Sequence, residues 1–118
     1  MQFSFSGHPQ ITAGLSERSD GSMVWWNRLP VDAAVQKNRD RYFKKLGVDP
    51  KRVVAGGMAH GINVAKAGET NAGKYLLNTD ALITNAPNLF LTVTVADCLP
   101  VYFYDPKTKS IGLAHAGW

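Results

Sequence analysis

Residues 89–118 read LFLTVTVADCLPVYFYDPKTKSIGLAHAGW, and this stretch decides the expected fold. Three runs rich in β-branched and aromatic residues, Leu89–Val95, Val101–Tyr104 and Ile111–Ala114, predict strands. Turn-forming residues in Asp105-Pro-Lys-Thr-Lys109 predict a hairpin loop between the last two. Shorter runs upstream predict three further strands, at Val53–Ala55, Ile62–Ala65 and Ala81–Thr84.

One helix is expected before these strands, because apolar side chains recur there with a period of about 3.6 residues. The face consists of Val31, Ala34, Val35, Tyr42, Phe43 and Leu46. The charged residues in between are expected to face solvent, namely Lys37, Arg39, Asp40, Arg41, Lys44 and Lys45. Gly47 and Pro50 mark the end of the helix. The chain is therefore predicted to be α/β, with a mixed β-sheet and flanking helices, in one unit over residues 1–118.

Composition narrows the class of protein. Apolar residues make up 45% and charged residues 19% of the chain, which is typical of a globular protein rather than a disordered one. The start, MQFSFSGHPQ, does not resemble a signal peptide, and no apolar run approaches the roughly 20 residues that span a bilayer. We therefore expect a cytoplasmic protein without a membrane partner.

The net charge of +4 raises the question of a nucleic-acid partner. Many of the basic residues fall between Lys37 and Arg52, mostly on the expected helix, and the rest are scattered. This distribution favours a solvated helix face, so no nucleic-acid partner is expected. A basic surface that attracts phosphate is a weaker alternative.

The last residues, Leu113-Ala-His-Ala-Gly-Trp118, follow an expected strand without a closing helix. Chain ends usually consist of frayed polar residues rather than a histidine and a large aromatic residue. The sequence is therefore expected to be the N-terminal part of a larger domain.

Three short segments combine a metal-binding residue type with small residues at the edge of an expected strand. They are Gly56-Gly-Met-Ala-His60-Gly61, Ala96-Asp-Cys98-Leu-Pro100 and Ala114-His115-Ala-Gly-Trp118. Imidazole and thiolate are ligands that zinc selects, and three protein ligands leave a fourth position open. Thiolate also suits copper. Spacing alone leaves a second interpretation open, a buried cysteine with two histidines in polar loops.

The amino-acid sequences of these segments resemble those of the YfiH family, once labelled multicopper polyphenol oxidase or laccase-like. The resemblance is in order along the chain and covers most of it. The matching stretches are Asn38-Arg39, Ala59-His60-Gly61, Asp80-Ala-Leu-Ile-Thr84, Val95-Ala-Asp-Cys-Leu-Pro-Val101, Tyr104-Asp-Pro106 and Ala114-His-Ala-Gly-Trp118.

The resemblance implies a YfiH-like layered sandwich, and a purine nucleoside phosphorylase that holds zinc, or copper, with His60, Cys98 and His115. Such an enzyme takes a purine nucleoside (adenosine, inosine or methylthioadenosine) and phosphate as substrates. The products are the free base and a ribose 1-phosphate, and deamination of adenosine is a second activity of the family. Multicopper oxidation would need more histidine ligands than the three in this chain.

Two positions depart from the family pattern. The family has an arginine near its N-terminus, in R-x-G-G-x-S, where this chain has Ile11-Thr-Ala-Gly-Leu-Ser16. It also tends to have glutamine where this chain has Met58. Since arginine makes bidentate contacts with phosphate, its absence bears on phosphorolysis more than on metal binding.

Four further residues complete the candidate site. Asp97 is a candidate catalytic residue together with Cys98 and His115, and it is expected either to support a ligand histidine or to cap the local backbone. Asn63, Asp80 and Trp118 are candidate substrate contacts, although an aspartate before a strand is also typical of a turn. Two alternative functions stay open: a metal-free hydrolase with Cys98 as nucleophile and His115 as base, and an inactive metal-binding fragment.

Overall fold

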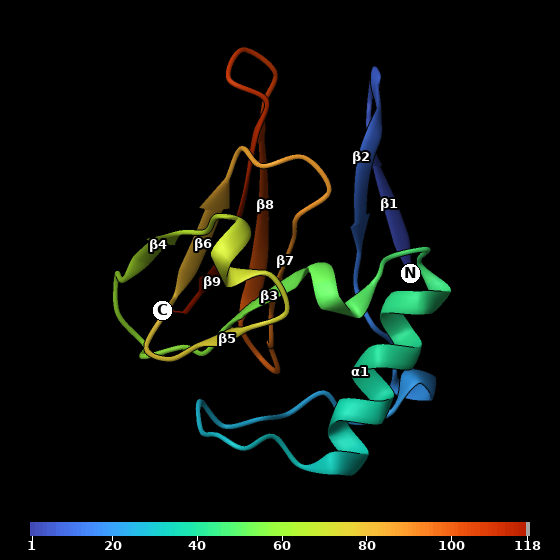
Figure 1. Cartoon of the computed structure of the whole chain (residues 1–118), viewed down its shortest axis with the longest axis vertical. Helices are drawn as coiled ribbons and strands as arrows, with labels where there is room; N and C mark the ends of the chain where they lie inside the picture. The colour runs from blue at the N-terminus through green and yellow to red at the C-terminus, as the bar shows by residue number, and fades with distance from the viewer. Residues whose placement is uncertain (118) are drawn as a thin grey trace.

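The computed structural model describes residues 1–117 and forms three sheets and one α-helix (Figure 1). Strands β1 (Gln2–Phe5) and β2 (His8–Gly14) form an antiparallel hairpin. A parallel three-stranded sheet has the order β5 (Tyr75–Leu76), β3 (Val53–Gly56), β7 (Phe90–Val93). A mixed four-stranded sheet has the order β4 (Val64–Lys66), β6 (Ala81–Thr84), β9 (Ser110–Ala116), β8 (Leu99–Asp105). The α/β class is therefore confirmed. Three short 3₁₀ turns connect these elements, η1 (Arg18–Asp20), η2 (Pro50–Arg52) and η3 (Glu69–Asn71).

Helix α1 spans Ala33–Lys45, and both of its ends are capped. The Asp32 carboxylate accepts hydrogen bonds from the backbone N–H groups of Ala34 and Val35 at its start. At its end Gly47 has φ +78°, and the Val48 N–H donates to the Phe43 carbonyl at 2.9 Å. The predicted stop at Gly47 is confirmed, whereas Val31 precedes the helix.

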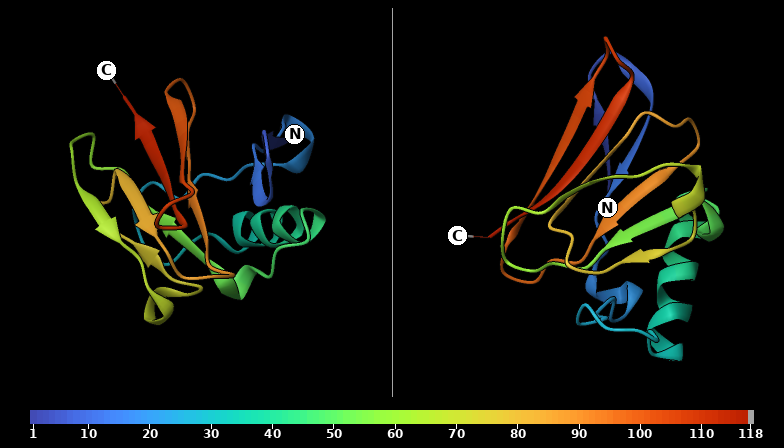
Figure 2. Two further views of the ribbon diagram at one scale, coloured as in Figure 1. Left: turned by 90° about the horizontal axis from the view of Figure 1, so that it is seen from above. Right: turned by 60° about the vertical axis from the view of Figure 1, so that its left-hand side comes forward.

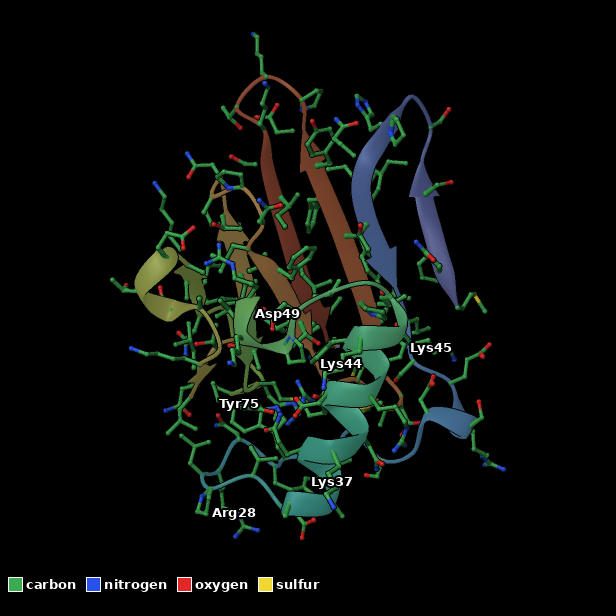
Figure 3. The ribbon with its side chains drawn as sticks, turned by 45° about the vertical axis from the view of Figure 1, so that its right-hand side comes forward. Arg28, Lys37, Lys44, Lys45, Asp49 and Tyr75 are labelled. Carbon is green, nitrogen blue, oxygen red and sulfur yellow. The ribbon has the colours of Figure 1, made fainter. Side chains whose placement is uncertain are left out.

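The prediction that Arg39 faces solvent is wrong, because its side chain is only 2% exposed. Arg39 lies four residues after Val35 and three before Tyr42, and this spacing puts all three on one helix face. The other basic residues of α1 are exposed as expected, and Figure 3 shows Lys37, Lys44 and Lys45 along the helix. Within residues 1–117, no helix combines the length and apolarity needed to cross a membrane.

The main core lies between the three-stranded and four-stranded sheets. Val54 of β3 and Leu82 of β6 are both 0% exposed and pack with Ala67 and Leu89. Within the four-stranded sheet, Leu82 pairs with Leu113 of β9, which in turn pairs with Tyr102 of β8. This register places the even-numbered residues of β6 and the odd-numbered residues of β9 on the same face of the sheet.

The β1–β2 hairpin packs against β8, far away in the sequence. The Phe3 and Phe5 rings contact the Tyr102 and Tyr104 rings edge-on, at centroid distances of 5.8 and 6.3 Å. The Tyr102 hydroxyl also donates to the Gly14 carbonyl at 2.8 Å. Figure 2 shows the hairpin and α1 on the same side of the two larger sheets. The hairpin is therefore attached to β8 through these contacts, although Phe3 and most of β1 stay exposed.

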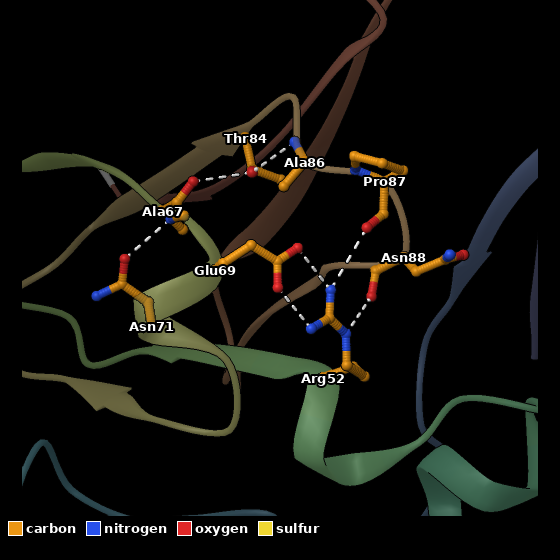
Figure 4. Close-up of polar contacts among 9 residues, drawn as sticks. Arg52, Ala67, Glu69, Asn71, Thr84, Ala86, Pro87 and Asn88 are labelled. Atoms are coloured by element: carbon orange, nitrogen blue, oxygen red, sulfur yellow. Dashed lines mark hydrogen bonds and ion pairs between the residues drawn. The ribbon is translucent and has the colours of Figure 1, made fainter.

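An exposed ion pair joins the two 3₁₀ turns η2 and η3. The Arg52 guanidinium donates to both carboxylate oxygens of Glu69, at 2.7 and 2.9 Å, and also to the carbonyls of Pro87 and Asn88 (Figure 4). In the same region (Figure 4), the buried Thr84 hydroxyl donates to the Ala67 carbonyl. These contacts fix the turn between β6 and β7, at the end of the four-stranded sheet away from His115.

Candidate functional site

Two of the three predicted metal ligands meet at the end of the four-stranded sheet. His60 lies in the exposed loop between β3 and β4 with φ +59°, and His115 lies in β9 with 8% of its surface exposed. Their ring centroids are 6.1 Å apart and the rings are nearly perpendicular, at 82°. Two imidazoles on one tetrahedral zinc ion have centroids on the order of 5 Å apart, given Zn–N bonds of about 2.0–2.1 Å. The two rings are thus about 1 Å further apart than in such a pair, in an edge-to-face contact.

Asp80 connects the two histidines through the backbone. Its carboxylate is buried and accepts hydrogen bonds from the N–H groups of Ala59 at 2.8 Å and Asn63 at 3.1 Å, on either side of His60. Its backbone carbonyl accepts from the N–H of His115 at 2.9 Å. Asp80 therefore fixes the His60 loop relative to strand β9.

Burial opposes ionisation of the Asp80 carboxyl, but the backbone N–H groups of Asn63, Gly61, Ala59 and His60 more than offset it. The net effect lowers the pKa of Asp80 below its ordinary value of 3.8. A carboxylate held in this way is ionised at neutral pH and binds the loop as an acceptor only.

The low pKa of Asp80 gives a testable pH dependence. Because the folded-state pKa is the lower one, the ionised carboxylate contributes stability above pH 3.8, and this contribution is lost as the pH falls through the folded value. We expect Asp80→Asn to lower the free energy of unfolding at pH 7 by about 1.5–3 kcal/mol, the range for hydrogen bonds to a charged group. Urea denaturation from pH 7 to pH 2.5 measures this. The difference between the two proteins should shrink at the acid end, and a difference that stays constant with pH would exclude this role.

Cys98 lies in a bend over residues 96–98, directly before strand β8 begins at Leu99. Pro100, two residues further on, lies directly opposite His115 in the β8–β9 ladder. The Cys98 side chain is half-buried and that of Asp97 is exposed. Across residues 1–117, no three His, Cys, Asp or Glu side chains come close enough to enclose a metal ion. The structure thus brings His60 and His115 together, and leaves Cys98 outside this pair.

Asn63 belongs to a network of amides beneath the His60 loop. Its Nδ2 donates to the Asn78 carbonyl at 3.1 Å. Asn78 and Asn27 bond reciprocally, since the Asn27 Nδ2 donates to the Asn78 Oδ1 and the Asn78 N–H donates to the Asn27 Oδ1, both at 2.9 Å. The Asn63 side chain thus supports the loop through its Nδ2. Trp118, the other candidate contact, lies outside the described residues.

Strand β3 ends at Gly56 and is followed by Gly57, where the neighbouring side chains leave no room for a Cβ. A Cβ on Gly57 would lie 2.7 Å from the Trp25 ring and closer still to the Asn27 Oδ1. Trp25 is buried with its ring against Tyr75, whereas Trp26 is 75% exposed. The supporting role of Asn27 and Asn78 could not be predicted from the amino-acid sequence, because their contact spans 51 residues.

Comparison with known proteins identifies the family of the chain. The family model described as multi-copper polyphenol oxidoreductase laccase matches residues 28–118. Curated relatives include the purine nucleoside phosphorylases YlmD of Bacillus subtilis, 37% identical over 74% of this chain, and ORF3 of Streptomyces griseus, 42% identical over 72%. The chain spans about a third of the length of each, 34% and 35%.

Solved structures give the same result for the fold. The chain superimposes on Bacillus licheniformis YfiH with a TM-score of 0.68 and 37% identity, over 71% of this chain and 34% of that one. A Neisseria meningitidis protein matches all of this chain and 50% of its own, with a TM-score of 0.71 and 24% identity. The chain therefore belongs to the multi-copper polyphenol oxidoreductase laccase family, which includes the YfiH-like proteins.

Proposed function

We propose that this chain provides the metal site of a purine nucleoside phosphorylase, with His60, Cys98 and His115 as zinc ligands and copper as the alternative ion. The observation that carries the proposal is the His60–His115 pair, 6.1 Å apart and connected through Asp80. The names of the curated relatives support phosphorolysis as the reaction.

The donor set fits zinc, because two imidazoles and one thiolate leave a fourth position for water or substrate. When bound, the ion would polarise the substrate or activate water. Asp80 keeps His60 in place through the loop backbone, and Asn63 and Trp118 are proposed to contact the nucleoside. Asp97, exposed beside Cys98, is proposed to support a ligand imidazole.

In the proposed reaction a phosphate oxygen bonds to C1′ of the ribose while the bond from C1′ to the base breaks. The base leaves with the bonding electron pair and takes up a proton. Ile11, half-buried in β2, replaces the arginine of the family pattern, so we expect weak binding of phosphate. Deamination of adenosine at the same site is the second proposed activity.

The test is to incubate the 118-residue chain with adenosine or inosine over a wide range of phosphate concentrations. We expect adenine or hypoxanthine and ribose 1-phosphate in equal amounts, at a rate that does not saturate at low phosphate. Cys98→Ala should lose this activity. Base release without phosphate would favour a metal-free hydrolase with Cys98 as nucleophile, and no release under any condition would contradict the proposal.

A further inference from the structure

The segment between η1 and α1 reaches the His60 loop, residues 57–63, through the side chain of Asn27. Both polar atoms of this half-buried amide bond to Asn78, since its Nδ2 donates to the Asn78 Oδ1 and its Oδ1 accepts from the Asn78 N–H, both at 2.9 Å. The Oδ1 also lies against the backbone of Gly57, at the start of the loop, because a Cβ added to that glycine would overlap it. Asn27 therefore joins the start of the loop to Asn78.

Asn78 and the residue after it hold both ends of the loop. The Asn78 carbonyl accepts from the Asn63 Nδ2 at 3.1 Å, at the far end. The buried Thr79 donates its N–H to the Gly57 carbonyl at 2.6 Å, at the near end. The contact between Asn27 and Asn78 thus bears on the whole loop, although it lies outside the loop itself.

The backbone of these segments is strained. Six residues other than glycine have a positive φ within residues 1–117, and four of them belong to this contact, namely Trp26, Asn27, His60 and Asn78, with φ from +50° to +59°. Residues other than glycine seldom adopt this left-handed conformation, and they keep it only where the surrounding contacts hold them. His60 therefore needs support to keep the backbone conformation in which its ring lies beside that of His115.

We propose that Asn27 is a positioning residue for the metal site, which holds the His60 loop in its zinc-binding conformation before the ion arrives. The inference rests on the proposed function, because it takes His60 as a zinc ligand. A loop that adopts its binding conformation for only part of the time binds its ligand more weakly, in proportion to that part. The Asn27 side chain bonds to Asn78 and to no residue proposed as a ligand, so it acts through the loop alone.

The test compares two variants of the 118-residue chain, with zinc alone as the probe. Asn27→Gly removes both hydrogen bonds without added strain, because glycine readily adopts φ +51°. Competition with a chromophoric chelator should give about tenfold weaker zinc binding, as expected for two hydrogen bonds that are partly exposed to water. Asn27→Asp should keep most of the affinity, because a carboxylate can accept from both the N–H and, after a flip of the amide, the Nδ2 of Asn78. Unchanged affinity in Asn27→Gly, or an equal loss in Asn27→Asp, would overturn the proposal.

Asn71→Gly is the matched control. Asn71 is also half-buried, and its Oδ1 accepts from the Gly68 N–H at 2.9 Å within η3. Its variant should bind zinc as tightly as the parent chain, even where urea denaturation shows a loss of stability like that of Asn27→Gly. Equal losses of zinc affinity in the two glycine variants would mean that the effect is one of general stability, which contradicts a positioning role.

Hydrogen exchange in the metal-free chain separates this inference from the proposed function. The N–H groups of Ala59 and Asn63, which donate to Asp80, report how often the loop opens. Asn27→Gly should raise their exchange rates about tenfold and Asn71→Gly should leave them unchanged. Unchanged rates in Asn27→Gly, in a parent chain that does bind zinc, would exclude the positioning role alone. A parent chain that binds no zinc would contradict the proposed function and this inference with it.

Discussion

Replacing Leu82 by alanine should lower the free energy of unfolding by about 2–5 kcal/mol, the range for large-to-small changes in a packed core. Leu82 is 0% exposed and lies between the two larger sheets with Val54. Its Cδ1 atom is 3.4 Å from the point where Gly56 would carry a Cβ, so the strands approach closely at this point. Since strands on both sides hold the space open, the structure has little freedom to collapse into the cavity. Urea denaturation followed by circular dichroism measures the loss.

The matched control is Ile83→Ala, one residue further along β6. Ile83 points to the opposite face of the sheet and is 44% exposed. It should therefore lose less than about 1 kcal/mol, because much of its side chain is already in water. Similar losses for both variants would contradict the register that pairs Leu82 with Leu113.

Zinc affinity should fall by about 100-fold or more in His60→Ala. Replacing a residue that only supports a ligand already lowers metal affinity by about 10–100-fold, and loss of a ligand itself should cost at least as much. His115→Ala should have the same effect. His60 is exposed, so its variant should keep the unfolding curve of the metal-free protein, whereas His115 is buried. Competition titration with a chromophoric chelator gives the affinity, and metal analysis gives the stoichiometry.

The third histidine of the chain is the control for these variants. His8 lies in β2 with its ring 4.8 Å from that of Tyr104, away from the site. His8→Ala should bind one zinc ion as tightly as the parent chain. A loss of affinity in His8→Ala, or unchanged affinity in His60→Ala, would rule out the proposed ligands. Unchanged affinity in Cys98→Ala would limit the site to the two histidines.

The strands of the second half were predictable because each is short, β-branched and bounded by turn residues. Ala81–Thr84 is found with the predicted bounds, and the hairpin at Asp105–Lys109 joins β8 and β9 as expected. The β1–β2 hairpin was missed, although Gln2-Phe3-Ser4-Phe5 alternates polar and apolar residues before Gly7. Two aromatic residues are too short a signal, and the strand that their rings contact, β8, is almost 100 residues away.

The site was harder to predict, because its supports are backbone contacts. The sequence showed His60 and His115 as candidates but not that Asp80 binds the N–H groups on both sides of His60. An aspartate before a strand is typical of many turns, so its residue type alone does not distinguish this role. Arg39 was assigned to solvent by its charge, although it lies on the same helix face as Val35 and Tyr42, and Tyr42 is buried.

The packing of the first hairpin on β8 has a consequence for synthesis on the ribosome. Phe3 and Phe5 find their partners Tyr102 and Tyr104 only after the ribosome has added the roughly 100 residues that lie between them. At about 5–20 residues per second, that delay is on the order of 5–20 s. During this interval the nascent chain exposes two phenylalanines and unpaired strand edges, the surface that chaperones bind and that aggregation begins from.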